Sequence, residues 1–419
     1  MRLIFLFNTI SWRFIITCFL VGFSNASGQG FNTAASWNLI EYGNRISALG
    51  QSSSALNNRI AFHPNPAIPA ETGIVTFSSY LISSKPVQVL ADDRPVMYNP
   101  AISYRIGKWS FSGKLDYTRF GFDIELRDEA NNLLGERRAS HDTRIIRMNV
   151  SRELFNKLYF GLGVSHIKDH IPILGRSQLH MFYDRAASGF MFSAGLYYHD
   201  SFPITWILLR PQVGLALTDI GGVLSYDVDS QSVEPQLMSF NSQYTTPGQL
   251  HSNFGLDIVT QKIVANQRFA QVGFYLGLNK YMSGLMKPGE GEVFYTGLEM
   301  VTGTWGSFER AAGRETTTFT LSDQLSNSFG IEFGLLETLF FQFGKISGAD
   351  MWIRPQSTYG VILNQRYVSL SYNYIKYRQS NYWVFDKWST SVWNIDIRVP
   401  IDGGLRPTFL DSIIEWLSE

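Results

Sequence analysis

Two histidines, His166 and His170, have a spacing that could bind a metal ion. On a helix, residues four apart lie on one face, as two ligands of one ion must. These two residues instead stand at the end of a strand-like pattern, and the following Ile171-Pro172 argues against a helix. We interpret them as a solvated loop pair, and we predict no metal site and no cofactor.

The chain is rich in serine, but it lacks the motifs that make serine a nucleophile. No Gly-x-Ser-x-Gly segment, phosphate-binding loop or dinucleotide fingerprint is present. The neighbouring carboxylates Asp92 and Asp93 precede Arg94 and Pro95, a composition typical of a solvated loop. We therefore predict no catalytic residues, and we keep a hydrolase with Ser and His on adjacent strands as a third hypothesis.

Residues 46–70 are the strongest candidate for a functional segment. The stretch is polar and rich in small residues, and it contains His63 followed by Asn65, Pro66 and Ala67. A buried polar segment needs hydrogen-bond partners for its backbone, and a barrel with a polar lumen supplies them. We predict that this segment is a hatch inside such a barrel, with these four residues as hatch or gate candidates. The plainer interpretation of His63 is a hydrogen-bonded packing residue.

The first 28 residues have the pattern of a secretory signal peptide. Arg2 and Arg13 are basic, residues 14–23 are apolar, and small residues follow at Ala26 and Gly28. Cleavage is expected after one of those two positions, and an uncleaved anchor is the alternative. The single cysteine, Cys18, would leave with the signal, so no disulfide and no cysteine-based metal site is expected.

Composition and patterning point to one large β architecture. The 35 Lys and Arg balance 35 Asp and Glu, which gives no basic surface for nucleic acid. Apolar and polar residues alternate strictly in many segments, as in residues 109–118, so each predicted strand has one apolar and one polar face. Such strands fit a soluble sandwich or propeller, or a transmembrane barrel with lipid outside and a wet lumen inside.

Three features favour the barrel. The apolar faces are rich in aromatic residues, and short connections alternate with longer polar ones, such as residues 127–142, 227–251 and 287–292. The polar faces carry isolated charges that suit a lumen: Lys114, Asp116, Arg147, Glu332 and Arg398. The roughly 390 residues left after cleavage would provide about 14 strands. We predict an all-β fold, a transmembrane antiparallel β-barrel in the cell outer membrane with the hatch in its lumen.

The predicted organisation has four parts. Residues 1–28 form the signal, residues 29–72 the N-terminal segment with the hatch, and residues 73–400 the barrel. Residues 401–419 form a tail with Phe409, Ile413, Ile414 and Leu417 at helical spacing. This tail is expected to be a short amphipathic helix that caps the barrel rim; a helix that docks a partner is the alternative.

Several segments resemble the FadL-like outer-membrane proteins, including the PorV and PorQ group. Residues 49–55, LGQSSSA, followed by residues 60–67, IAFHPNPA, are similar to the N-terminal signature of that family, in which Asn-Pro-Ala follows an aromatic residue. Residues 215–222, LALTDIGG, resemble an internal L-x-L-x-N-x-G segment of that family, with Asp219 in place of Asn. Residues 330–332, 359–361 and 371–374 resemble the family's closing strands. The motifs are short, and a second Asn99-Pro100-Ala101 makes that motif less specific here.

The resemblance implies a 14-stranded barrel with an N-terminal hatch and two functions. PorV-like and PorQ-like members serve type IX secretion, and the small residue before Gln29 favours that branch. The first hypothesis is therefore a non-enzymatic barrel that sits in outer-membrane lipid and binds secretion-machinery proteins or secreted cargo. The second is a FadL-like conduit for hydrophobic small molecules. An apolar pocket with a lateral opening would favour the conduit.

Overall fold

The computed structural model describes most of the predicted barrel and part of the predicted hatch. The described residues are 46, 48–49, 61–70, 74–84, 96–127, 133–174, 182–225, 243–264, 267–282, 285, 287, 293–306, 308–312, 315–348, 356–377 and 389–400. The predicted signal peptide, the predicted loop at Asp92 and Asp93 and the predicted tail helix lie outside them.

The wall of the molecule is a single antiparallel sheet in which strands that follow one another along the chain are paired. Its strands are β1 (Ile74–Ser84), β2 (Val96–Tyr98), β3 (Ala101–Ile106), β4 (Trp109–Arg127), β5 (Leu133–Phe155), β6 (Leu158–Leu174), β7 (Phe182–His199), β9 (Ile207–Gly221), β12 (Gln249–Thr260), β15 (Ala270–Tyr281), β18 (Leu325–Leu335), β19 (Leu339–Gly348), β20 (Gln356–Asn364), β21 (Val368–Tyr377) and β22 (Ser389–Pro400).

Shorter elements lie at the two ends of the wall. They are β8 (Phe202–Ile204), β10 (Val223–Ser225), β11 (Gln243–Thr245), β13 (Ile263–Val264), β14 (Gln267–Arg268), β16 (Phe308–Ala312), β17 (Glu315–Phe319), the helix α3 (Leu298–Thr302) and the 3-10 helix η4 (Leu321–Gln324). In the described part of the chain, no helix is both long and apolar enough to cross a membrane.

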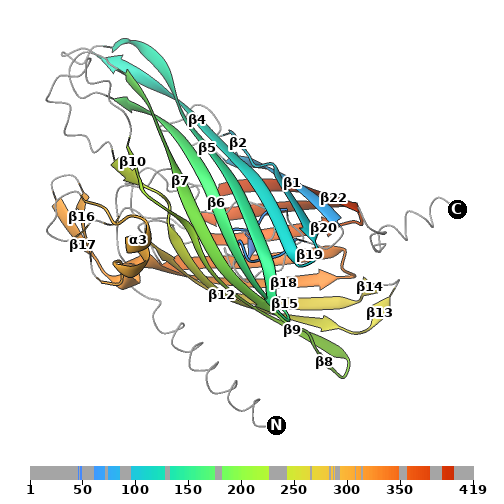
Figure 1. Cartoon of the computed structure of the whole chain (residues 1–419). Helices are drawn as coiled ribbons and strands as arrows, with labels where there is room; N and C mark the ends of the chain where they lie inside the picture. Colours follow the sequence, from blue (N-terminus) through green and yellow to red (C-terminus); the bar gives the residue numbers. More distant parts are fainter. Residues whose placement is uncertain are drawn as a thin grey trace.

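The sheet closes on itself. The first strand, β1, pairs with the last, β22, from Ile74↔Pro400 to Ser84↔Thr390, and β9 pairs with β12. Counting β2 and β3 as one strand, the described residues form a closed barrel of 14 antiparallel strands, which confirms the predicted fold class (Figure 1). Closure leaves no unpaired edge, so every wall strand has hydrogen-bonding neighbours on both sides.

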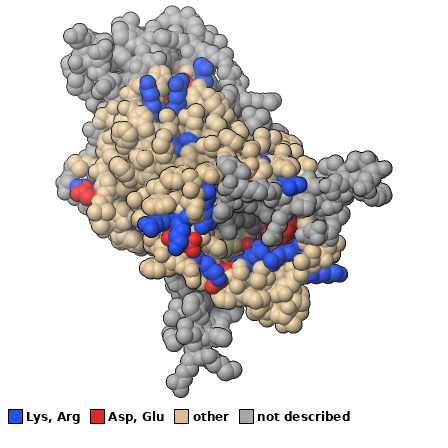
Figure 2. Space-filling view, turned by 45° about the vertical axis from the view of Figure 1, so that its right-hand side comes forward, with Lys and Arg blue, Asp and Glu red and all other residues tan. Residues whose placement is uncertain are grey.

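Alternation along each strand separates an apolar exterior from a polar interior. The outward residues include Phe111, Phe190 and Phe333, which are 48%, 62% and 54% exposed. The five charges predicted for the lumen, Lys114, Asp116, Arg147, Glu332 and Arg398, are all buried inside. Figure 2 shows a broad surface with few charged side chains, and charged groups gathered toward its upper edge and its lower part. An apolar band around a polar interior is the pattern of a transmembrane barrel, so the chain is a multi-pass outer-membrane β-barrel.

The two ends of the barrel differ in the length of their connections. Short turns join the strands at one end, for example at Gly107-Lys108 between β3 and β4, where Gly107 takes a positive φ of 56°. Two-residue hairpin turns require such backbone angles. The other end carries the long connections, among them the segment between β15 and β18 that holds α3 and the β16–β17 hairpin. By the usual asymmetry of such barrels, the short turns are periplasmic and the long connections extracellular.

Four strands rise well above the rest of the extracellular end. β4, β5, β6 and β7 are 19, 23, 17 and 18 residues long, whereas the strands from β18 to β22 have 9 to 12 (Figure 1). The prediction of a loop over residues 127–142 is therefore wrong for most of that range, because it forms strand. Residues 133–142 were assigned to a loop because their sequence, LLGERRASHD, shows no alternation of apolar and polar residues.

The structure also corrects the position of His166 and His170. Both lie within β6, on its outward face, and not in a loop. Pro172 does not end the strand, because the β5–β6 ladder stops at Asp142↔His170 while the β6–β7 ladder continues to Leu174↔Phe182. Beyond His170 the strand has no ladder on its β5 side, which is where proline is tolerated. The predicted hairpin in residues 328–345 is confirmed as β18, the turn at residues 336–338, and β19.

Candidate functional site

The described hatch residues contact opposite walls of the lumen. Ala48 accepts a hydrogen bond from Thr358 Oγ1 of β20 at 2.8 Å. Asn65 Nδ2 donates to the Leu196 carbonyl of β7 at 3.1 Å. Because β20 and β6, the neighbour of β7, are seven strands apart in a ring of 14, these contacts lie on opposite sides of the barrel. The described hatch residues therefore occupy the lumen at two opposite walls.

The Asn-Pro-Ala motif builds a compact turn at the β6–β7 side. Asn65 Oδ1 accepts the Ala67 N–H at 3.0 Å, and the Asn65 carbonyl accepts the Ile68 N–H at 3.2 Å. The side-chain amide of Asn65 thus holds its own turn while its NH₂ group binds the wall. An aspartate would lose that donor. Pro66 fixes φ near the value that such a turn needs, and Ala67 is fully buried.

Glycines on the inward face of the wall make room for the hatch. A Cβ added at Gly161 of β6 would overlap the carbonyl group of Pro66 and the amide nitrogen of Ala67, and one at Gly195 of β7 would overlap Asn65 Oδ1. On the opposite side, a Cβ at Gly330 of β18 would come within 2.7 Å of the Leu49 carbonyl oxygen. Backbone can approach backbone this closely only where the wall residue has no side chain.

Two fully buried tyrosines support the hatch from the wall. Tyr275 packs against Ile46 and Leu49, and Tyr197 packs with Ala67 and Ile68. Their hydroxyl groups are held by one hydrogen-bonded chain that runs across β7, β9, β12 and β15. Within it, Tyr197 donates to Gln212 Oε1 at 3.2 Å, Gln212 Nε2 donates to Asp257 Oδ2 at 2.8 Å, and Tyr275 donates to Asp257 Oδ1. The wall therefore holds both hydroxyl groups through contacts that do not involve the hatch.

An ionic cluster occupies the lumen beside the hatch. Asp116 pairs with Lys114 Nζ at 2.9 Å and with Arg147 Nε at 2.9 Å, and it accepts a hydrogen bond from Asn99 Nδ2. Arg147 also pairs with Asp219 through Nη1. All five side chains are buried, so two cations face two carboxylates away from bulk water. Such a cluster is held together only while every member is present, because a single buried charge without a partner is costly.

A β-bulge directs Asp219 into this cluster. The β7–β9 register shifts between Phe192 and Ala194, opposite Asp219, whose φ is 56°. The Asp219 N–H donates to Ser193 Oγ at 3.1 Å. Asp and Asn adopt this left-handed conformation more readily than other side chains. This explains physically why the position resembles one that holds Asn in the L-x-L-x-N-x-G segment.

The wall is interrupted next to the hatch. β2 and β3 pair with β1 on one side and β4 on the other, in one continuous register. On the β1 side the ladder has a gap: it runs to Ser78↔Ala101 and resumes only at Leu81↔Tyr98. The skipped residues are Asn99 and Pro100, and proline has no N–H for a ladder. On the inner side, Ala61 and Phe62 of the hatch form one apolar cluster with Ala101. An apolar part of the hatch therefore lies behind the interruption.

His63 is neutral in the docked hatch. Its Nδ1 accepts the Asn65 N–H at 3.2 Å, and its carbonyl accepts Asn149 Nδ2 at 3.0 Å. Burial, with a smaller effect of nearby His251, lowers the pKa of His63 from 6.5 to about 3. His63 Nε2 is buried and has no hydrogen-bond partner in the described structure. Protonation would therefore place an unbalanced charge inside the lumen.

We expect acid to weaken hatch docking. The pKa of His63 is about 3 when docked and 6.5 when free, so docking is fully favourable above pH 6.5 and weakens as the pH falls toward 3. At pH 5 the loss is about 2 kcal/mol, or roughly 30-fold in the docking equilibrium. The measurement is maleimide labelling of an Ala61→Cys reporter in a Cys18→Ser background, in detergent, since Ala61 is buried when docked.

The matched control is His63→Asn, whose side-chain oxygen can replace Nδ1 as acceptor and does not titrate. The ratio of labelling in the two proteins at each pH removes the pH dependence of thiol chemistry. A ratio that stays constant from pH 7.5 to pH 5 would show that His63 does not control docking.

The structure brings all four predicted hatch residues, His63, Asn65, Pro66 and Ala67, into one buried turn in the lumen; their role as a gate stays a prediction. Sequence reasoning missed Gly161 and Gly195, although glycine on the polar face of a strand is a usable signal for close approach. Within the described ranges, no group of three or more His, Cys, Asp or Glu side chains could hold a metal ion.

Comparisons with known proteins find similar folds but no sequence match. No protein-family model matches the chain, and no curated protein matches its sequence. Among solved structures, the Ralstonia pickettii toluene transporter TbuX has 11% identity and a TM-score of 0.45, with 87% of this chain and 100% of that chain covered. The Pseudomonas putida toluene transporter TodX has 11% identity and a TM-score of 0.48, covering 85% and 97%. A Pseudomonas aeruginosa FadL homologue has 10% identity and a TM-score of 0.39, covering 91% and 100%. Likenesses this remote do not assign a function.

Proposed function

We propose that this outer-membrane barrel passes small hydrophobic molecules from the cell exterior into the membrane, with the hatch as its gate. The observation that carries the proposal is the apolar cluster of Ala61, Phe62 and Ala101 directly behind the interruption of the wall at Asn99 and Pro100. A solute that reaches this point has apolar contacts inside and the apolar band of the membrane outside.

The position of the hatch in the lumen makes an open aqueous pore an unfavourable interpretation. Its described residues bind β20 on one side and contact β6 and β7 on the other, so water and polar solutes meet hatch residues at two opposite walls of the lumen. The remaining lumen lining is mostly polar and hydrogen-bonded, which suits a solute that leaves sideways rather than one that crosses the full length. A lateral exit through the wall needs a place where the ladder is weak, and the proline at position 100 provides one.

The ionic cluster would keep this exit closed in the resting state. Asn99 donates to Asp116, and Lys114 Nζ lies 5.6 Å from the centre of the Phe62 ring. The same cluster thus contacts both the interrupted strand and the hatch. Movement of Phe62 would remove a contact of Lys114, and we propose that this coupling opens the exit when a solute displaces the hatch.

The role in type IX protein secretion through bound partners, which the sequence motifs favoured, stays an untested prediction. Deleting the gene separates the two functions. We expect uptake of radiolabelled toluene or a labelled fatty acid to fall while surface delivery of secreted proteins is unchanged. Loss of surface delivery with normal uptake would support the secretion role and contradict the conduit.

We expect a disulfide between hatch and wall to stop uptake. The change is Ala61→Cys with Ala101→Cys in the Cys18→Ser background, which places two thiols in one buried cluster. Oxidised protein should lose most of its uptake of labelled toluene, and reductant should restore it, because the hatch can no longer leave the interruption. The two single-cysteine proteins are the controls. Full uptake by a protein whose cross-link is verified by mass spectrometry would exclude the hatch as the gate.

A further inference from the structure

The outer surface of the tall wall carries a row of four polar side chains across four neighbouring strands. Cross-strand pairing aligns Tyr117 of β4 with Arg144 of β5, Arg144 with Lys168 of β6, and Lys168 with Ser188 of β7. Arg144, Lys168 and Ser188 are exposed, and Tyr117 is partly exposed. The row therefore offers one guanidinium, one ammonium and the Ser188 hydroxyl along a single line, while the Tyr117 hydroxyl donates to Asp142 at 3.0 Å.

The two cations at the centre of the row lack carboxylate partners. Arg144 lies 5.5 Å from the centre of the Tyr117 ring, and neither Arg144 nor Lys168 forms an ion pair with any side chain that the structure describes. Like charges directly opposite each other on adjacent strands repel and destabilise the pair. An anion placed between them would remove this repulsion.

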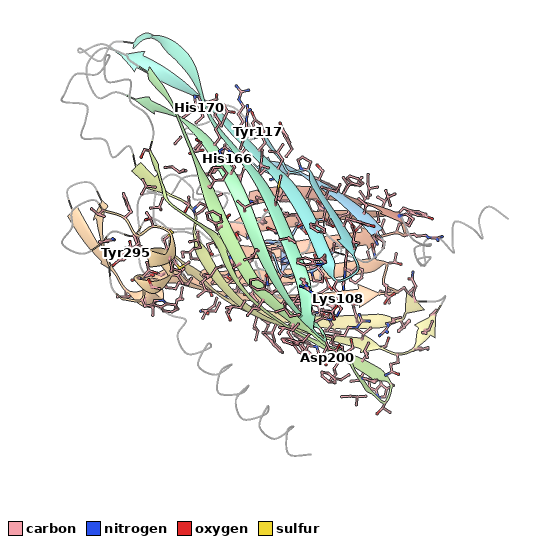
Figure 3. The ribbon with its side chains drawn as sticks, in the orientation of Figure 1. Lys108, Tyr117, His166, His170, Asp200 and Tyr295 are labelled. Carbon is pink, nitrogen blue, oxygen red and sulfur yellow. The ribbon has the colours of Figure 1, made fainter. Side chains whose placement is uncertain are left out.

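A second row lies just above the first. Arg119 is paired with Asp142 at 3.6 Å, and His170 lies 4.0 Å from the same carboxylate, which also accepts the Tyr117 hydroxyl at 3.0 Å. Asp142 is therefore occupied by the upper row and the tyrosine. Figure 3 shows Tyr117 on β4 and His166 and His170 on β6 in the upper part of these strands, and Figure 2 shows basic side chains at the upper edge of the described surface.

Below the polar row, the same strands turn apolar. The next outward row is Leu115, Ile146, His166 and Phe190, and the His166 ring lies 5.0 Å from the Phe190 ring. Further down, Met148, Val164 and Phe192 are 61%, 40% and 61% exposed. The surface thus changes from cationic to apolar within one pair of residues along each strand, as the boundary between headgroups and acyl chains requires.

This boundary lies on the extracellular side. β4 and β5 reach it on their way toward their long extracellular ends, and the short turns at Gly107-Lys108 and Asn156-Lys157 lie at the other end of the same strands. The ligand must therefore carry negative charge in the headgroup of the outer leaflet and chains that lie along the apolar rows. Guanidinium and ammonium groups at such a level bind phosphate.

We propose that Arg144 and Lys168, with the Ser188 hydroxyl, form a binding site for the phosphate of a lipid A-type glycolipid in the outer leaflet. The glycolipid's acyl chains would pack on Ile146, Met148, Val164, Phe190 and Phe192. The site is on the outside of the barrel and does not depend on the conduit. It fixes one face of the tall wall to its surrounding lipid and supports the strands where they leave the membrane.

The test is binding of diphosphoryl lipid A to the purified full-length barrel in detergent, measured by native mass spectrometry. We expect Arg144→Gln with Lys168→Gln to weaken binding by roughly 30-fold, at about fivefold for each cation removed. The matched control is Lys108→Gln with Arg152→Gln, which removes two exposed cations at the periplasmic end, one in the β3–β4 turn and one on β5, and should leave binding unchanged. Heat-modified mobility on gels confirms that both variants fold.

Two further probes separate the sources of the signal. Dephosphorylated lipid A and phosphatidylcholine should bind the wild type as weakly as the Arg144→Gln, Lys168→Gln protein binds lipid A. Inorganic phosphate in large excess should displace lipid A only weakly, because it has no acyl chains. Equal binding of lipid A by the variant and the wild type, equal binding of the dephosphorylated form, or displacement by inorganic phosphate at comparable concentration would each overturn the proposal.

Discussion

A single methyl group at Gly161 or Gly195 is expected to expel the hatch from its docked position. An alanine Cβ at Gly161 would occupy the space of the Pro66 carbonyl and the Ala67 nitrogen, and one at Gly195 the space of Asn65 Oδ1. The atoms in conflict belong to hatch and strand backbone or to a side chain fixed by two hydrogen bonds, so no flexible group can yield. Overpacking of this kind costs about 1–3 kcal/mol.

Two measurements report the displacement. Labelling of the Ala61→Cys reporter should rise by roughly 5- to 150-fold in Gly161→Ala and Gly195→Ala, which is the same free energy expressed as an equilibrium constant. Reconstituted into planar bilayers, both variants should show a larger ion conductance than the parent, because the hatch residues that fill the lumen beside β6 and β7 would leave their places.

Gly113→Ala provides the control for these variants. Gly113 is also a barrel glycine, but its added Cβ would have its nearest neighbour at 3.7 Å, an ordinary contact. Its labelling and conductance should equal those of the parent. If Gly161→Ala stayed unlabelled and kept the parent's conductance while folding normally, the hatch would not depend on the space at that glycine.

Removing Arg147 is expected to cause the largest loss of barrel stability. Arg147 Nε and Nη1 bind Asp116 and Asp219, and these two carboxylates are 4% and 3% exposed. Arg147→Ala leaves Asp219 without the guanidinium that pairs with it and Asp116 with Lys114 alone. Breaking a buried ion pair by deleting one partner costs about 3–5 kcal/mol. The measurement is the urea midpoint of unfolding in lipid vesicles, followed by gel mobility.

Arg152→Ala is the matched control, since Arg152 belongs to the same strand but faces outward, 4.9 Å from the Trp109 ring. We expect it to cost less than about 1 kcal/mol. In a double-mutant cycle, Asp219→Asn should recover part of the loss in the Arg147→Ala background, because it removes one buried unpaired charge. Equal midpoints for the two arginine variants would mean that water solvates the cluster and that it contributes no stability.

Much of the barrel was predictable because side-chain period is a local property. Phe111 and Lys114 fall on opposite faces by parity alone, and the lumen charges from Lys114 to Arg398 were assigned correctly on that basis. Strand number followed from length. The extra length of β5 did not follow from the sequence, because residues 133–141 show no alternation of apolar and polar residues that would mark a strand.

The site was predicted as a segment but not as a set of contacts. His63 and Asn65 are conspicuous in sequence, yet their partners Asn149 and Leu196 lie 86 and 131 residues away, and no local pattern encodes such a pairing. In the sequence, Asn99-Pro100-Ala101 is a second copy of the hatch motif Asn65-Pro66-Ala67, and it makes that motif less specific. In the structure it interrupts the wall, a role that depends on the ladder of β1 and is invisible in a single strand.

The hydrogen bond at Ser78 has a consequence for how the molecule is assembled. Ser78 Oγ of β1 accepts the Ala61 N–H at 3.0 Å and donates to Asp396 of β22, so the hatch is bonded to the seam between the first and last strands. A nascent barrel that still lacks β22 has neither that aspartate nor a complete lumen. The full set of hatch contacts therefore exists only after β22 has closed the barrel, and we expect a chain truncated before β22 to expose its N-terminal segment to periplasmic proteases.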